Sequence, residues 1–283
     1  MHFEKLVLAI VLMGAMVPAN AQWLDYPERG TPLTRDGKPN LLAKAPRTLN
    51  GKPDLSGVWQ IEPPADGEIE RLYGAFDGVA LVVGDDPRIF SRYFTNLLID
   101  FKPGEEPIRP EAAAQARKNR QILDSPSSHC LPYGLPNRYF HFRPFKIFQA
   151  PEAIAIFYEA DGAFRQIHTD GRKLPADPFP SWMGYSTGKW DGDTLVVDTA
   201  GFNDKAWLDA MGHPRSEALR VQERFHRRDF GHMDVEATVE DPNILTKPVT
   251  IKFTEVLIPN SDVLENFCAE GERDRAYMPV AIP

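Results

Sequence analysis

The sequence lacks several features that point to familiar classes of protein. It carries no basic excess, because its formal net charge is −8 at pH 7. This argues against a nucleic-acid partner, which needs a positively charged face. Neither a phosphate-binding loop nor a dinucleotide fingerprint occurs. The stretch GYSTG at 184–188 lies in a strand context, not at the strand-to-helix turn that a hydrolase serine requires.

Long apolar segments are also scarce. The run from Leu6 to Val17 follows a short start with one Lys and covers about 12 residues, against roughly 20 that a bilayer span needs. It is followed by PANA, with small residues at the alternate positions that a signal peptidase reads. We therefore expect residues 1–21 to be a signal peptide. The mature chain should have no membrane span and be periplasmic or secreted.

Cysteine is rare as well, with Cys130 and Cys268 as the two examples. Neither has a CxxC neighbour, and an even pair in an exported protein favours a disulfide. A metal-binding pair or a nucleophilic thiol is the alternative.

Proline, in contrast, is abundant, with 26 residues in the chain. Such a number predicts many loops and few long helices. Residues 22–53 contain two similar D/N-G-K-P turns and are expected to form an extended arm. One clear helix is predicted over 109–123, and a second, short one over 203–212.

The remainder, 54–283, reads as one mostly β domain. Apolar segments alternate with turn signals such as Asp161-Gly162 and Asp191-Gly192. The expected strands lie within 54–63, 152–160, 164–170, 182–190, 194–202, 218–228, 232–240 and 249–258. Consecutive hairpins predict an antiparallel meander that closes as a barrel or folds as a sandwich. The Gly-x-Trp at Gly57–Trp59 favours a lipocalin-like barrel.

Several motifs resemble those of a broad family of exported bacterial proteins. They are CLPYGLP at 130–136, TDGR at 169–172, SWMGYSTGKWDGDTLVVDTAGFND at 181–204, ERF at 223–225, DPNILTKP at 241–248 and FCAEG at 267–271. The resemblance covers about 50–275 and implies export and a disulfide, but no particular reaction. The chain departs from the family at His168, where members often carry an apolar residue, and at Ala269, where they often carry His.

Two carboxylates fall on the apolar faces of their strands. Glu223 shares a face with Val221 and Phe225, and Glu255 shares one with Phe253 and Leu257. Since a lone buried carboxylate is costly, each is expected to be ion-paired, to lie at the barrel mouth, or to work in a site.

Two His-x-Asp pairs begin at His168 and His232. Brought together on adjacent strands they would suit Zn²⁺ or Fe²⁺. The spacing of these residues allows a metal site but does not indicate one, so no metal and no cofactor is predicted. The polar stripe that contains His232 is otherwise a solvated outer face.

The stretch RQIHTDGR at 165–172 attracts most interest. With Phe164, Gln166, His168 and Asp170 on one face, it passes from apolar to charged, as the wall of a pocket does from base to rim. A proline loop after it leads to Trp182 and Tyr185, which would cover the pocket. An ordinary salt bridge at the end of a strand is the alternative.

These observations predict an enzyme that performs cofactor-free acid–base chemistry, as a lyase, isomerase or hydrolase. Its substrate would be a small apolar or aromatic molecule held in the barrel. The predicted catalytic residues are Glu223 or Asp170 as base, His168 as acid and Arg172 as stabiliser of negative charge. The predicted substrate-binding residues are Phe164, Trp182, Tyr185, Glu255 and His232. A periplasmic binding protein without turnover, or an envelope interaction module that uses the arm, is the alternative.

Overall fold

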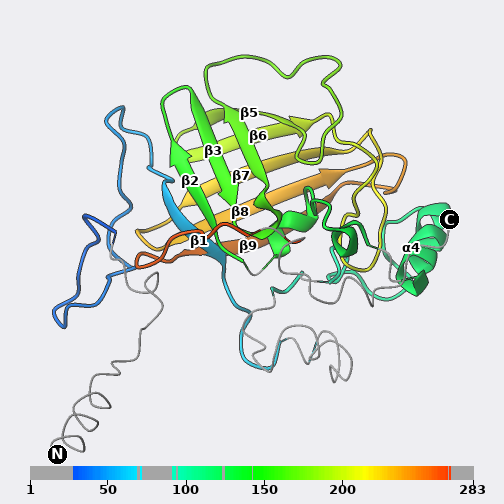
Figure 1. Ribbon diagram of the computed structural model, residues 1–283, viewed down its shortest axis with the longest axis horizontal. Helices are drawn as coiled ribbons and strands as arrows, with labels where there is room; N and C mark the ends of the chain where they lie inside the picture. The colour runs from blue at the N-terminus through cyan, green and yellow to red at the C-terminus, as the bar shows by residue number, and fades with distance from the viewer. Residues whose placement is uncertain are drawn as a thin grey trace, which may run out of the picture.

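Nine strands close into one barrel in a computed structural model of the chain (Figure 1). The structure describes residues 28–68, 71, 91–93, 95–122, 125–141, 143–266 and 268, so the predicted signal peptide lies outside the described residues. The strands are β1 Gly57–Ile61, β2 Phe145–Gln149, β3 Ala153–Tyr158, β4 Phe164–His168, β5 Tyr185–Asp191, β6 Thr194–Ala200, β7 Arg220–Arg227, β8 His232–Glu240 and β9 Val249–Leu257. The mostly β prediction is confirmed. Strand β2 was not predicted.

The meander is interrupted between β4 and β5. Each strand pairs with the next in an antiparallel manner except here, where Ile167 aligns with Ser186 and His168 with Thr187 in parallel. The prediction of a mostly antiparallel barrel is confirmed, and the hairpin order that the sequence predicts is broken only at this step. The proline-rich connection over 169–184 crosses from one end of the barrel to the other, which a two-residue hairpin turn cannot do.

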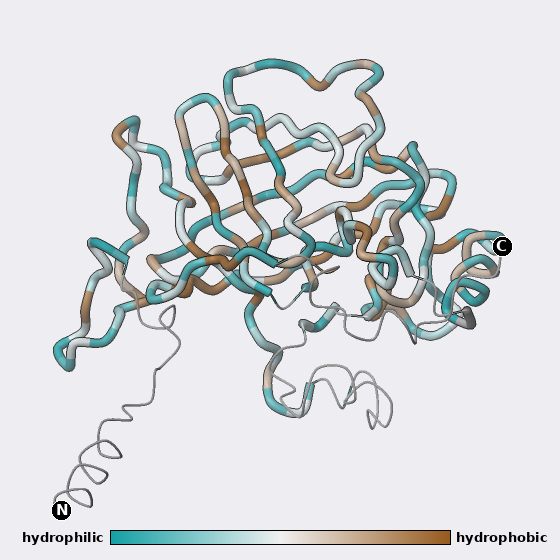
Figure 2. Tube along the Cα trace, viewed as in Figure 1, coloured by the Kyte–Doolittle hydropathy of each residue, from teal (hydrophilic) through white to brown (hydrophobic). Residues whose placement is uncertain are grey.

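Period-two alternation explains which side chains fill the barrel. In β8 the residues Met233, Val235, Ala237 and Val239 are all buried, at 2% exposure or less. Their neighbours in sequence are only partly buried or exposed, as one-sided burial of a strand requires. Figure 2 shows the same pattern along the chain, with apolar residues concentrated in the strands and polar ones in the loops.

Trp59 and Arg227 pack against each other at the start of β1. The indole of Trp59 is fully buried and donates to the carbonyl of Leu55 over 3.0 Å. The guanidinium of Arg227 lies 4.9 Å above that ring and donates to the carbonyl oxygens of Asp54 and Phe230. Gly57 has a φ of 136°, and a side chain there would approach Leu257 to 2.5 Å. The glycine of the Gly-x-Trp sequence thus allows this close approach of Leu257.

Residues 28–56 precede β1 and form loops that project at one side of the barrel (Figure 1). The two similar sequences fold into the same turn. Thr34 pairs its N–H with the carbonyl of Lys38 over 2.8 Å, and Thr48 pairs with Lys52 over 2.9 Å. The segment is attached to the barrel domain through Arg47, which donates to Asp193 over 3.0 Å.

One helix prediction is confirmed and the other is wrong. The helix α4 spans Pro110–Ile122, with Glu111 in its first turn. The segment 203–212 forms turns and bends rather than a helix. The Asn203 carbonyl and side chain accept from the buried Arg215, and Asp209 accepts from the Leu97 N–H over 2.8 Å. These long-range bonds outweigh the local preference for a helix.

The cysteine prediction is confirmed. Cys130 and Cys268 form a disulfide with their Cα atoms 5.4 Å apart. The bond joins the loop after the short 3₁₀ helix η2 (Pro126–His129) to the segment that follows β9.

Candidate functional site

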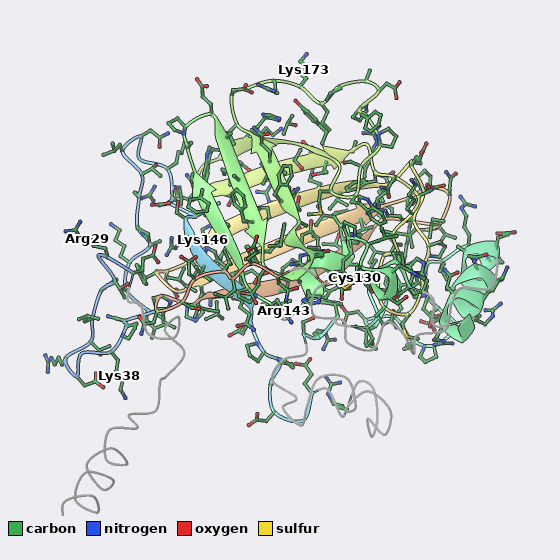
Figure 3. The ribbon with its side chains drawn as sticks, in the orientation of Figure 1. Arg29, Lys38, Cys130, Arg143, Lys146 and Lys173 are labelled. Carbon is green, nitrogen blue, oxygen red and sulfur yellow. A yellow bond between two sulfur atoms is a disulfide. The ribbon has the colours of Figure 1, made fainter. Side chains whose placement is uncertain are left out.

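Four of the predicted site residues lie together, but outside the barrel. Arg172 donates to both carboxylate oxygens of Asp170 and, over 3.2 Å, to the hydroxyl of Tyr185. The ring of His168 stacks on that of Tyr185 with centroids 5.0 Å apart. Paired with Arg172, the carboxyl of Asp170 has its pKa lowered to about 2. The cluster lies beside the proline loop that Lys173 marks in Figure 3.

The expected pocket face of β4 points to solvent. Phe164 is 68% exposed and Gln166 is exposed, whereas Arg165 and Ile167 are buried. The prediction that Phe164, Gln166, His168 and Asp170 wall a barrel pocket is therefore wrong. The sequence alternation predicts Arg165 on the face opposite the pocket, but the fold buries its side chain inside the barrel against a partner.

That partner is Glu223, which lies inside the barrel. Arg165 donates to both carboxylate oxygens of Glu223, over 2.7 Å at Oε1, and to the hydroxyls of Ser186 and Thr199 over 3.0 and 2.8 Å. Burial alone lowers the pKa of Arg165, but the charge of Glu223 outweighs it and the pKa lies above the ordinary value. Glu223 is fully occupied in this pair and is separated from the outer cluster by the barrel wall.

The other predicted residues are dispersed. Trp182 packs at the edge of the core, and its carbonyl accepts from Arg215 over 3.1 Å. His232 pairs with Asp229 over 2.7 Å at the turn between β7 and β8. Glu255 is buried between β1 and β8, in register with Ile61 and Met233, and its Oε2 has no hydrogen-bond partner.

A buried arginine that was not predicted stands apart from the others. Arg138, Arg165, Arg215 and Arg227 are all buried among the described residues. Three of them donate to carboxylate, hydroxyl or carbonyl oxygens, whereas none of the three side-chain nitrogens of Arg138 has a hydrogen-bond partner. Because a buried charge without hydrogen bonds costs several kcal/mol, this exception points to a ligand or a function.

Arg138 is held in place by local structure and by aromatic rings. It belongs to the 3₁₀ helix η3 (Asn137–Phe140), which follows the Leu135-Pro136 bond. Its guanidinium lies 4.6 Å above the ring of Tyr158 and 6.0 Å above that of Tyr133. Its nearest carboxylate is Asp161, with Nη1 and Oδ1 3.6 Å apart.

A cavity of about 290 Å³ borders this pair and is called here the Asp161 cavity. Its lining residues are Ser127, Cys130, Leu131, Tyr133, His141, Arg143, Ala160, Asp161, Asn266 and Cys268. The disulfide thus forms part of its wall, and Cys130 and Arg143 lie close together in Figure 3. Arg138 is not among the lining residues, but its guanidinium lies 3.6 Å from Asp161 and 6.0 Å from the ring of Tyr133, which both line the cavity.

Burial changes the protonation of the groups in the cavity. It holds the pKa of His141 well below the ordinary value, assisted by the charges of Arg138 and Arg143, so the ring is neutral at pH 7. Burial also raises the pKa of Asp161, against the opposing charge of Arg138. Asp161 Oδ2 accepts from the Tyr133 N–H over 3.0 Å, whereas its Oδ1 has no hydrogen-bond partner.

Arg138 is linked to the ion pair inside the barrel through Tyr158. Tyr158 lies between Arg138 and Arg165, and burial raises the pKa of its hydroxyl to about 12. Glu223 is therefore the one predicted catalytic residue that belongs to this buried network. In the sequence, Arg138 stands in a proline-rich stretch with no strand period, so no pattern marks it as buried. The motif CLPYGLP next to it is the signal that could have drawn attention there.

A metal centre does not emerge from the described part of the chain. Within it, no three or more His, Cys, Asp or Glu side chains gather in a way that could hold an ion. The two His-x-Asp pairs lie on β4 and β8, which are not neighbours in the barrel. No helix within the described ranges is long and apolar enough to cross a bilayer.

Comparison with known proteins adds no family. No protein-family model matches the chain, and no curated protein matches it.

Proposed function

We propose that this protein binds a small molecule in the Asp161 cavity. One observation carries the proposal: the buried guanidinium of Arg138 has no hydrogen-bond partner, and it lies 3.6 Å from the carboxylate of Asp161, which lines that cavity. Buried charges in proteins are normally paired and hydrogen-bonded, and unsatisfied ones gather at sites that receive a ligand. The cavity volume is at the small end of ligand pockets, which hold roughly 300–1,000 Å³.

The protonation state of the His141 ring favours a binding function over a catalytic one. The neutral ring accepts the Arg143 N–H at Nδ1 over 3.3 Å, so its remaining ring nitrogen carries a proton and acts as a donor. A ring in that tautomer does not supply a general base.

Cofactor-free acid–base turnover of the bound molecule is the second candidate, and Asp161 favours it. Its Oδ1 is buried without a partner and its pKa is raised, which are the properties of a general base. Arg138 would stabilise negative charge that develops on the substrate. In this candidate Asp161 takes the role of base and Arg138 that of charge stabiliser, whereas a catalytic role for His168, Asp170 and Arg172 stays a separate prediction.

Export to the periplasm or the medium is part of the proposal. The disulfide supports it, because such bonds persist in oxidising compartments. A lipocalin-like architecture is also proposed, supported by the Gly-x-Trp at the start of β1.

Ligand-observed NMR with a library of small fragments tests the binding function. The matched pair of variants is Leu131→Trp, which fills the cavity from a residue that is 44% exposed, and Leu42→Trp, at an exposed residue outside the cavity. We expect fragments that bind the wild-type protein and Leu42→Trp, and lose binding to Leu131→Trp. A library without any fragment of this behaviour overturns the proposal.

Turnover is tested on the same fragments. Product formation by the wild-type protein that is lost in Asp161→Asn, with binding retained, supports the acid–base candidate. If fragments bind but none of them is converted to a product, the acid–base candidate is wrong and the protein is a binding protein.

A further inference from the structure

The walls of the Asp161 cavity come from two distant parts of the chain. Most of the lining residues lie between positions 127 and 161, whereas Asn266 and Cys268 belong to the segment that follows β9. The Cys130–Cys268 disulfide joins the two parts and is itself part of the wall. The shape of the cavity therefore depends on a bond between residues 138 positions apart.

The first part of the wall is fixed by contacts of its own. The Tyr133 N–H donates to Asp161 over 3.0 Å, and Arg143 donates to Glu159 over 3.2 Å. Neither contact involves Cys268, so this part keeps its place whether or not the disulfide is formed.

The second part of the wall is held chiefly by the disulfide. Upstream of the bond, Asp262 accepts from Lys146 over 2.9 Å, and the Leu264 N–H donates to Glu159 over 3.1 Å. Both contacts are exposed to solvent, where ion pairs and hydrogen bonds contribute little to holding a chain in place. Without the disulfide, this side of the cavity is free to move away from the other.

The barrel, in contrast, closes without the disulfide. All nine strands lie between positions 57 and 257, and β1 completes the ring by aligning Trp59 with Leu257. Cys130 precedes β2 and Cys268 follows β9, so neither lies within the sheet. Both cysteines are partly exposed and therefore accessible to thiol reagents. Breaking the bond should open the cavity and leave the barrel folded.

We infer that oxidation of Cys130 and Cys268 switches on ligand binding in the Asp161 cavity, which is complete in the disulfide form and open on one side in the dithiol form. The inference rests on the proposed binding function and names the regulation of its site. With the proposed export, the chain gains its binding site only after it has left the reducing cytosol.

The switch is a thiol–disulfide exchange whose oxidant is another disulfide, of a protein or of a small molecule. The thiolate of one cysteine attacks the oxidant, forms a mixed disulfide and releases one thiol. The second cysteine attacks the mixed disulfide, forms the Cys130–Cys268 bond and releases the other thiol. Two protons and two electrons thus pass from the two cysteines to the oxidant.

The probes for the test are the fragments that bind the wild-type protein and lose binding to Leu131→Trp. Their dissociation constants are measured by NMR titration against the oxidised wild type, the wild type reduced with dithiothreitol, and Cys130→Ser/Cys268→Ser. We expect binding to weaken at least about tenfold in the reduced protein and in the double variant, and to return after reoxidation of the wild type with oxidised glutathione. Dithiothreitol should not change binding to the double variant, which has no disulfide to reduce.

Far-UV circular dichroism and tryptophan fluorescence of the same samples report whether the barrel is folded. A folded double variant that binds the fragments within about twofold of the wild type overturns the inference. A double variant without a folded barrel overturns it as well, since the disulfide would then support the whole fold and not one wall of the cavity.

The unaltered chain supplies a second, independent measurement. Because binding and oxidation are linked, a fragment that binds only the disulfide form shifts the dithiol–disulfide equilibrium toward the disulfide. At about ten times its Kd, the fragment should raise the ratio of disulfide to dithiol about tenfold in a dithiothreitol buffer of fixed composition. Thiol labelling and mass spectrometry measure this ratio, and an unchanged value contradicts the inference.

The two proposals fail separately. Fragments that bind the oxidised and the reduced protein alike, in a manner sensitive to Leu131→Trp, overturn the switch and leave the binding function. A library without any fragment sensitive to Leu131→Trp overturns both.

Discussion

Replacing Glu223 by glutamine tests how much the barrel depends on one buried ion pair. The substitution Glu223→Gln keeps the shape of the side chain and removes its charge, so Arg165 is left charged inside the barrel. Both side chains are at most 1% exposed. The two hydroxyls that also accept from Arg165 remain in place.

The expected cost is large because the remaining charge cannot reach water. Breaking a buried ion pair by removing one partner costs about 3–5 kcal/mol. At about 2–4 °C per kcal/mol for a protein of this size, the Tm should fall by roughly 6–20 °C. The double variant Arg165→Met/Glu223→Leu removes both charges and fills the space with apolar atoms. It should regain most of that loss, since apolar replacement of buried pairs is often neutral or stabilising.

Urea unfolding followed by tryptophan fluorescence, with the disulfide intact, measures the free energy of unfolding of each variant. Asp193→Asn is the control, because it breaks the exposed pair with Arg47 and should change stability little. A cost below about 1 kcal/mol for Glu223→Gln would refute the reasoning, since it would mean that water reaches Arg165. A double variant as unstable as the single one would assign the effect to packing instead of charge.

Three further predictions concern the contributions of other titratable side chains to stability. Asp170→Asn breaks an exposed pair and should move the Tm by no more than about 2 °C in a thermal melt; a fall of many degrees would make this strand end structural. His213 bonds to the buried Asp209 over 2.7 Å; burial lowers its pKa, but the charge of Asp209 outweighs this and the pKa is raised. The stabilisation by this His213–Asp209 pair is therefore complete below the unfolded pKa of about 6.5, and it is lost as the pH rises through the higher folded pKa. The variant His213→Gln should therefore lower the Tm more at pH 6 than at pH 8.5. An equal fall in Tm at both pH values would contradict this prediction. Burial raises the pKa of Glu255 well above the ordinary value, so the stability of the fold falls as the pH rises above the unfolded pKa of this group. In urea titrations, Glu255→Gln should stabilise the protein by on the order of 1–3 kcal/mol at pH 8 and by less at pH 4.5. Destabilisation at pH 8 would mean that the charge of Glu255 is compensated in the fold.

Local pattern was sufficient wherever the physical cause is local. The alternation in β8 predicted the buried face of that strand, and Pro110 with Glu111 predicted the start of α4. The two similar turns in residues 28–56 follow from their Gly-Lys-Pro sequences in the same way. With two cysteines the disulfide has one possible pairing, so its partners needed no structure.

The candidate site, in contrast, depends on contacts between distant parts of the chain. The face of β4 was predicted wrongly because Arg165 is buried by Glu223, which lies 58 residues further on. Arg138 carries no periodic signal, and only the packing of η3 against Tyr158 shows that it is buried without a hydrogen bond.

The sequence by itself determined a mostly β protein, its one helix, most of its strands and its disulfide, because hydrophobic period, helix-starting residues and turn chemistry act over a few residues. Only the tertiary structure decided which charged side chains lie inside, that β4 and β5 run parallel, and that Asp161 and Arg138 meet at a cavity. The cost of burying a charge depends on what surrounds it in space, and that surrounding comes from residues far apart in the chain.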